Sequence, residues 1–260
     1  MTNLPNKFRK PLILVLILIP IAIAAGVFTA LYQLELYPKE MFAEAIAQLG
    51  STWVLVMITA VQTVGYAVFC GFFGYILADK TGLIKPLKFE MRSTVIVTLT
   101  SLVFGAALFF ADLGFNALMP EMSAEFQTST EATLGISGII ASLLYGGIIE
   151  EVMLRLLVMS LLVFVIWKLF CRKYQNTEIP NGVYTAAIIL SALLFAVGHL
   201  PANAVIFGTL TPIVILRCIV LNGIGGIVFG IYYRKYGLHY SILSHMLFHV
   251  GMKAATVIMM

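Results

Sequence analysis

The chain has 260 residues, of which 61% are hydrophobic and 11% charged, and its mean hydropathy is +1.01. Soluble domains carry about 45–50% apolar and about 25% charged residues, so this composition excludes an ordinary soluble core and predicts an all-α, polytopic transmembrane helix bundle. The net charge of +4 lies in short loops, where it indicates membrane orientation, and we expect no nucleic-acid partner.

Apolar segments long enough to cross a bilayer recur along the whole chain. A spanning helix needs about 20 apolar residues, and the candidates are residues 12–31, 53–77, 94–118, 134–168, 183–200, 204–233 and 241–259. We expect the first to be retained as a span, because it is long for a signal peptide. The fourth and sixth exceed one upright span, so either could be tilted or broken, and the sequence predicts seven or eight helices.

Charged loops alternate in sign between the predicted spans. The connection after the first span leans acidic, whereas the connection after the second is basic, with Lys80, Lys85, Lys88 and Arg92. Basic loops stay in the cytoplasm. The pattern therefore predicts an integral multi-pass protein of a cell membrane, with its N-terminus in the cytoplasm.

Three charged residues interrupt the fourth apolar segment. An ionisable group at the bilayer centre costs roughly 2.5–3.5 kcal/mol on insertion scales, so it needs a partner or a cavity. On a helix, Glu151 and Arg155 share one face in the order that favours an ion pair. Glu150 points elsewhere, and an unpaired carboxylate in such a site can act as a general base. A structural charge network or a transport path is an equally good interpretation of this segment.

All four histidines lie after this segment. His199 ends the predicted fifth span, and Pro201 is expected to stop that helix. His245 and His249 are four residues apart on one face of an apolar helix, which indicates a cavity or a hydrogen-bonded pair. Their spacing also suits zinc, although Met246 stands where the zinc-protease motif has Glu. The fourth histidine, in the short loop before the last span, is interpreted as interfacial.

The order of these elements resembles the CAAX protease and bacteriocin-processing family, also called the Abi or type II CAAX prenyl endopeptidase family. The elements are Glu150-Glu151-Val-Met-Leu-Arg155, Phe195-Ala-Val-Gly-His199 and His245-Met-Leu-Phe-His249, and the resemblance covers roughly residues 134–251. We therefore expect residues 1–133 to form three N-terminal spans and residues 134–260 to form the catalytic core of a single integral membrane unit.

The resemblance implies an intramembrane glutamic-type endopeptidase that needs no cofactor. Glu150 would be the general base, with His199 holding the same water, and His245 and His249 would donate to the developing oxyanion. The acid–base pair four residues apart, Glu151 and Arg155, would support the site. The substrate would be a membrane-associated peptide or protein at the lipid bilayer, and a bacterial cell membrane is the expected location.

His249 departs from the family pattern, in which Asn often stands, but a neutral imidazole still has one N–H to donate. The departure leaves Glu150, His199, His245 and His249 as a zinc set, so a zinc-dependent protease is a lesser alternative. A non-catalytic bacteriocin-immunity or scaffold protein and a proton-coupled transporter also stay open. If every span crosses fully, His199 and His245 lie at opposite ends, which requires a site near the midplane or a broken segment.

Overall fold

The computed structural model describes residues 6–171 and 178–260, and within them every regular element is helical. Seven of these helical segments are long and apolar enough to cross a membrane. The predicted polytopic bundle is therefore confirmed, with seven candidate spans. They are Phe8–Leu36, Thr52–Lys80, Met91–Ala117, Ile136–Phe170, Asn181–Phe207, Pro212–Tyr236 and Leu238–Met259.

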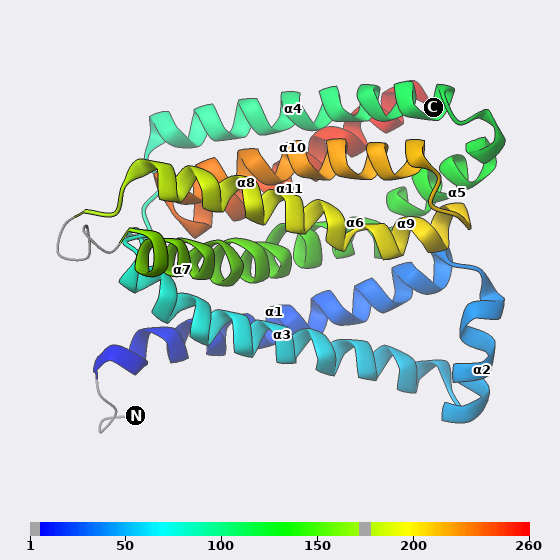
Figure 1. The fold of residues 1–260 in the computed structure, drawn as a ribbon. Helices are drawn as coiled ribbons and strands as arrows, with labels where there is room; N and C mark the ends of the chain where they lie inside the picture. Colours follow the sequence, from blue (N-terminus) through cyan, green and yellow to red (C-terminus); the bar gives the residue numbers. More distant parts are fainter. Residues whose placement is uncertain (1–5, 172–177) are drawn as a thin grey trace.

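The long helices run alongside one another, as Figure 1 shows. Helix α1 packs on α3, α4 packs on α11, and α8 packs on α10, while the segment α6–η2–η3–α7 contacts all three pairs. Helices α2, α5 and α9 lie at the end of the bundle opposite the N-terminus (Figure 1). The elements are α1 (Asn6–Leu36), α2 (Lys39–Leu49), α3 (Thr52–Lys80), α4 (Met91–Ala117), η1 (Pro120–Met122), α5 (Ser123–Leu134), α6 (Ile136–Ala141), η2 (Ser142–Glu150), η3 (Val152–Met159), α7 (Ser160–Phe170), α8 (Asn181–Gly198), α9 (Leu200–Phe207), α10 (Pro212–Tyr236) and α11 (Leu238–Met259).

The long fourth segment is one continuous helix with a widened middle. Its backbone takes the i→i+5 pattern of a π-helix through η2 and η3, on both sides of Glu151. Such wide turns are rare and are frequently found at functional sites. The segment is therefore unbroken, but its most unusual backbone coincides with the charged residues.

The predicted start of the sixth span was wrong. Residues 204–207 belong to α9, which ends at Gly208 with a φ of 68°, and α10 begins at Pro212. Apolar residues continue through this turn, so hydropathy alone does not register the glycine that ends the helix. Helix α10 then runs unbroken past Arg217 and the glycine-rich stretch that followed it in the sequence.

Helices α4 and α11 approach each other closely at two glycines. A Cβ atom on Gly105 would collide with the Phe248 carbonyl, and one on Gly251 would collide with the Leu102 carbonyl. Small residues allow this close backbone contact between membrane helices. The contact fixes α11, the helix that carries the paired histidines.

Candidate active site

Glu151, between η2 and η3, lies at the centre of the buried polar cluster, and none of its side chain is exposed. Its Oε1 accepts a hydrogen bond from Nδ1 of His245 at 2.9 Å, and its Oε2 accepts one from the Ser241 hydroxyl. Nε of Arg155 lies 3.4 Å from the same Oε2. The Glu151 carboxylate is thus fully engaged by protein groups and has no exposed surface on which to hold a water.

Arg155 is also completely buried, and aromatic rings flank its guanidinium. The guanidinium carbon lies 5.3 Å from the Phe195 ring centroid and 6.0 Å from that of Phe229. Cation–π attraction adds to the ion pair with Glu151 at these distances. Its guanidinium nitrogens have no hydrogen-bond acceptor among the described residues, so Arg155 depends on Glu151 for charge compensation.

His245 is held between two flat rings. The Phe229 ring stacks on it at 4.2 Å and the His249 ring at 4.9 Å, while the edge of Phe195 lies at 5.9 Å. Because the Glu151 carboxylate can only accept, Nδ1 of His245 carries the proton of their hydrogen bond. Nε2 is therefore the nitrogen available to a ligand. It accepts a hydrogen bond in the neutral ring and donates one in the imidazolium.

Glu150 is the half-buried neighbour of Glu151 and has different surroundings. It lies within electrostatic range of Tyr145 and Arg155. Within the described part of the chain, no hydrogen bond or ion pair engages its carboxylate. The structure therefore separates the two glutamates: Glu151 is bonded to His245, whereas Glu150 is joined directly to none of the three histidines.

His199 stands at the junction of α8 and α9, within the fifth candidate span. Helix α8 ends at Gly198, just before Pro201, as predicted, but the span continues into α9, where Pro201 lies in the first turn and its missing N–H is harmless. Nδ1 of His199 bonds the Phe195 carbonyl at 2.8 Å, and the two rings are 4.6 Å apart. Since the carbonyl can only accept, Nε2 of His199 is the free acceptor.

Phe195 lies against both His199 and His245. These two histidines are therefore close together and do not lie at opposite ends of the bundle. The fifth span continues through α9, so His199 lies inside it. His249 is within electrostatic range of His199. The three histidines therefore converge within the spans.

Gly146 makes room for the His249 imidazole. A Cβ atom at Gly146 would lie 2.8 Å from Nε2 of His249, and one at Gly147 would collide with Met246. The two glycines let η2 approach α11 closely. They bring the segment that carries Glu150 next to the paired histidines.

A second buried polar network reaches His199 through its backbone. Arg217 forms a two-pronged ion pair with Asp112, with Nε–Oδ1 at 2.5 Å and Nη2–Oδ2 at 2.8 Å. Its Nη1 donates to Asn203 at 3.1 Å, and Nδ2 of Asn203 donates to the His199 carbonyl at 2.9 Å. The network connects α4, α9 and α10 at the point where His199 interrupts the helix.

Sequence reasoning missed Ser241, Asn203 and Asp112 as parts of these networks. Ser241 precedes His245 by four residues and Asn203 follows His199 by four, so helical spacing could have indicated both. Asp112 lies outside the motifs, and its partner is 105 residues away. Only the packing of α4 against α10 could reveal it.

The histidine of the last loop, His239, lies in the first turn of α11. Its Nε2 is 3.1 Å from the Lys88 carbonyl, at the end of the bundle that also carries the basic loop. Although it shares α11 with His245 and His249, its partners are Lys88, Phe89 and Tyr240, which lie outside the site.

The residues of the suggested zinc set do not fit a metal ion. Within residues 6–171 and 178–260, no three His, Cys, Asp or Glu side chains converge as ligands. The rings of His245 and His249 stack nearly parallel, at 19°, an arrangement that does not direct both rings at one ion.

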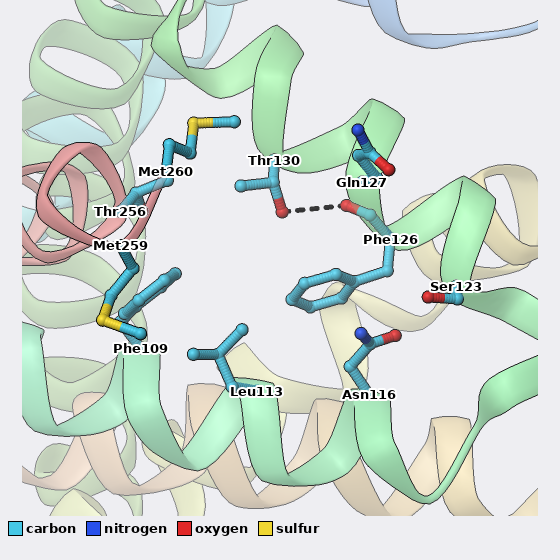
Figure 2. Close-up of a pocket in the computed structure, with 10 residues that line it drawn as sticks. All are labelled: Phe109, Leu113, Asn116, Ser123, Phe126, Gln127, Thr130, Thr256, Met259 and Met260. Atoms are coloured by element: carbon cyan, nitrogen blue, oxygen red, sulfur yellow. Dashed lines mark hydrogen bonds between the residues drawn. The ribbon is translucent and has the colours of Figure 1, made fainter.

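A pocket of about 230 Å³ opens between α4, α5 and the end of α11, and Figure 2 shows the Phe126 ring and the Leu113 side chain directed into it. None of the predicted site residues lines it. Phe126 also lies over the Arg217 guanidinium, 5.9 Å from its carbon. The lining residues are Phe109, Leu113, Asn116, Ser123, Phe126, Gln127, Thr130, Thr256, Met259 and Met260.

Comparison with known protein families gives a match over part of the chain. The model of the type II CAAX prenyl endopeptidase Rce1-like family matches residues 132–251, a range that holds Glu150, Glu151, Arg155 and the three converging histidines. Searches among curated proteins and among solved structures found no match. The match spans 120 of the 260 residues, and over this segment the chain is similar to the Rce1-like type II CAAX prenyl endopeptidase family.

Proposed function

We propose that this protein is an intramembrane endopeptidase in which Glu150 activates a water to hydrolyse peptide bonds. Similarity of residues 132–251 to a prenyl endopeptidase family supports a membrane protease in general. The observation that carries the specific proposal is the contrast between the two adjacent glutamates. Glu151 is committed to His245, Ser241 and Arg155, so Glu150 is the carboxylate left to hold a water.

Glu150 and His199 would share the nucleophilic water. Nε2 of His199 is an acceptor because Nδ1 donates to the Phe195 carbonyl, so this ring can accept a hydrogen bond from one O–H of the water while Glu150 takes the proton of the other. Attack on the scissile carbonyl then gives a tetrahedral intermediate, and the proton held by Glu150 passes to the leaving amine. In this scheme, both groups touch the reacting atoms.

His245 and His249 would stabilise the oxyanion. With Nδ1 bonded to Glu151, His245 can donate to the oxyanion only when Nε2 also carries a proton. His249 can donate from a neutral ring. Two preorganised donors in a low-dielectric site are the usual means of stabilising such an intermediate.

The position of the site favours a substrate at the membrane. His199, His245 and Glu150 all lie within candidate spans, so a scissile bond must enter the bilayer region to reach them. We propose membrane-associated peptides or proteins as substrates. The charge pattern of the loops supports a cytoplasmic N-terminus, and we propose a bacterial cell membrane as the location.

The test is cleavage of a library of membrane-tethered peptides by the purified protein in liposomes. Wild type, Glu150→Gln and the control Glu125→Gln are compared; Glu125 is an exposed carboxylate on α5, outside the site. We expect wild type and Glu125→Gln to cleave equally, with or without a chelator, and Glu150→Gln to lose activity by at least about 10³-fold.

Three outcomes would redirect the assignment. Cleavage abolished by the chelator and restored by zinc would replace glutamate-activated water with metal catalysis. Full cleavage by Glu150→Gln would remove Glu150 as the base. Peptide binding by wild type and Glu150→Gln alike, with cleavage by neither, would favour a non-catalytic immunity or scaffold protein.

A further inference from the structure

A second pocket, of about 400 Å³, lies at the end of the bundle that holds the N-terminal end of α1. The ends of α3, α7 and α8 surround it, at the left of Figure 1. Its described lining residues are Lys80, Thr81, Gly82, Trp167, Glu178, Ile179, Asn181 and Tyr184. None of them belongs to the candidate active site.

Lys80 lines this pocket, and two further cations lie over the rings of lining residues. Nζ of Lys80 lies 5.7 Å from the Phe164 centroid. Nζ of Lys168 lies 4.0 Å from the ring of Trp167, a lining residue. The Arg234 guanidinium lies 4.6 Å from the ring of Tyr184, another lining residue. An aromatic ring attracts a cation without cancelling its charge, so Lys80 and Arg234 keep their positive charge beside these rings.

The positive charges of Lys80 and Arg234 are not paired with carboxylates in the described part of the chain. Among the described residues, neither Lys80 nor Arg234 has a carboxylate within ion-pair distance; Arg234 donates instead to the amide oxygen of Asn181 at 2.5 Å. Glu178 is the one carboxylate among the described lining residues. The pocket therefore keeps a positive excess with one acceptor beside it.

The N-terminus of α8 adds to the positive potential of this pocket. Asn181 begins α8, an 18-residue helix whose N-terminus has no side-chain cap and whose first residue lines the pocket. A helix N-terminus attracts anions through its free N–H groups and its dipole. Cationic side chains at the rim and the uncapped N-terminus thus favour the same kind of ligand, an anion.

We propose that this pocket binds the phosphate group of an anionic phospholipid. The charge pattern predicts that this end of the bundle faces the cytoplasm, where basic pockets between membrane helices bind lipid head groups. Trp167 and Tyr184 are the residue types that lie at the level of the head groups. A volume of about 400 Å³ accommodates a phosphate with a small polar substituent, and Glu178 can accept a hydrogen bond from a head-group hydroxyl.

The experiment measures thermal unfolding of the purified full chain in detergent with added phosphatidylglycerol, phosphatidylcholine of the same acyl chains, or inorganic phosphate. Wild type is compared with the double variant Lys80→Gln/Arg234→Gln. The matched control is Lys88→Gln/Arg92→Gln, which removes two exposed cations from the same end of the bundle. Lipid retained on the protein is measured in parallel by native mass spectrometry.

We expect phosphatidylglycerol to raise the Tm of wild type and of the control by several degrees more than phosphatidylcholine does. The pocket variant should lose at least half of that difference and most of its retained phosphatidylglycerol. Equal losses in the two double variants would overturn the proposal in favour of diffuse surface charge. An equal Tm rise with inorganic phosphate alone would assign the pocket to a soluble phosphate compound. No advantage of phosphatidylglycerol in wild type would also overturn the proposal.

Discussion

Glu151 and His245 are joined by a 2.9 Å hydrogen bond between Oε1 and Nδ1, although 94 residues separate them in the chain. Both side chains are buried, and the bond fixes which nitrogen of His245 faces the site. The neighbouring Glu150 has no such bond. Adjacent residues of the same type therefore have separable roles, and this separation leads to the first prediction.

Replacing Glu151 should destabilise the protein, whereas replacing Glu150 should not. Glu151→Gln leaves the buried Arg155 charge without a counter-ion, and removing one partner of a buried pair costs about 3–5 kcal/mol. Glu150→Gln removes a carboxylate with no protein hydrogen bond, so its effect on stability should stay within about 0.5 kcal/mol. Thermal unfolding in detergent measures both.

Both substitutions should also lower cleavage, for different reasons. Glu150→Gln loses the base in a fully stable protein, and Glu151→Gln loses the orientation of His245. Equal unfolding temperatures for the two variants would contradict the assignment of Glu151 as the buried support.

Adding one methyl group at Gly146 should displace His249. The new Cβ atom would lie 2.8 Å from Nε2 of His249, closer than van der Waals contact permits. We expect Gly146→Ala to lower kcat by at least about 10-fold, since misplacement of one oxyanion donor is costly. Gly65→Ala is the matched control, because nothing lies within 4 Å of its added Cβ atom. Unchanged kcat in Gly146→Ala would mean that His249 is not needed at this position.

An Asn side chain at position 249 should support activity. It supplies an N–H donor, as the imidazole does, and it is the residue that the related family often has here. We expect His249→Asn to keep kcat within about 10-fold of wild type, and His249→Ala to lose about 10²–10³-fold, the effect of removing an oxyanion donor. Similar losses in both variants would show that the imidazole itself is required.

The Asp112–Arg217 ion pair should couple strongly in a double-mutant cycle. Asp112→Asn alone removes the counter-ion of Arg217, whose side chain is 16% exposed, and leaves it amide oxygens as acceptors, which should cost about 3 kcal/mol of unfolding free energy. Arg217→Gln should then lower the unfolding free energy much less in the Asp112→Asn background than in wild type.

The exposed pair Lys88–Glu90, at 3.6 Å, provides the comparison. Its coupling energy should stay below about 1 kcal/mol because water screens it. Comparable coupling energies for the two pairs would contradict the interpretation that Asp112 and Arg217 interact within the low-dielectric interior.

The sequence by itself determined the membrane class, a bundle of seven or eight helices, and the three motifs. Long apolar runs leave a membrane helix as the only backbone that satisfies its own hydrogen bonds, so composition fixes the fold class. The i,i+4 spacing also gave the Glu151–Arg155 pair, because four residues bring side chains to one helix face in both α and wide turns. The division of the chain at residue 133 stays a prediction.

Only the tertiary structure decided which glutamate bonds His245, how His199 reaches the paired histidines, and what neutralises Arg217. Each answer depends on contacts between helices far apart in the chain: Glu151 with His245, Phe195 with both His199 and His245, and Asp112 with Arg217. Helical periodicity sets the face on which a side chain lies, but it does not specify the neighbouring helix. That choice comes from packing, where Gly105, Gly251 and Gly146 let particular helices approach closely enough for these polar groups to meet.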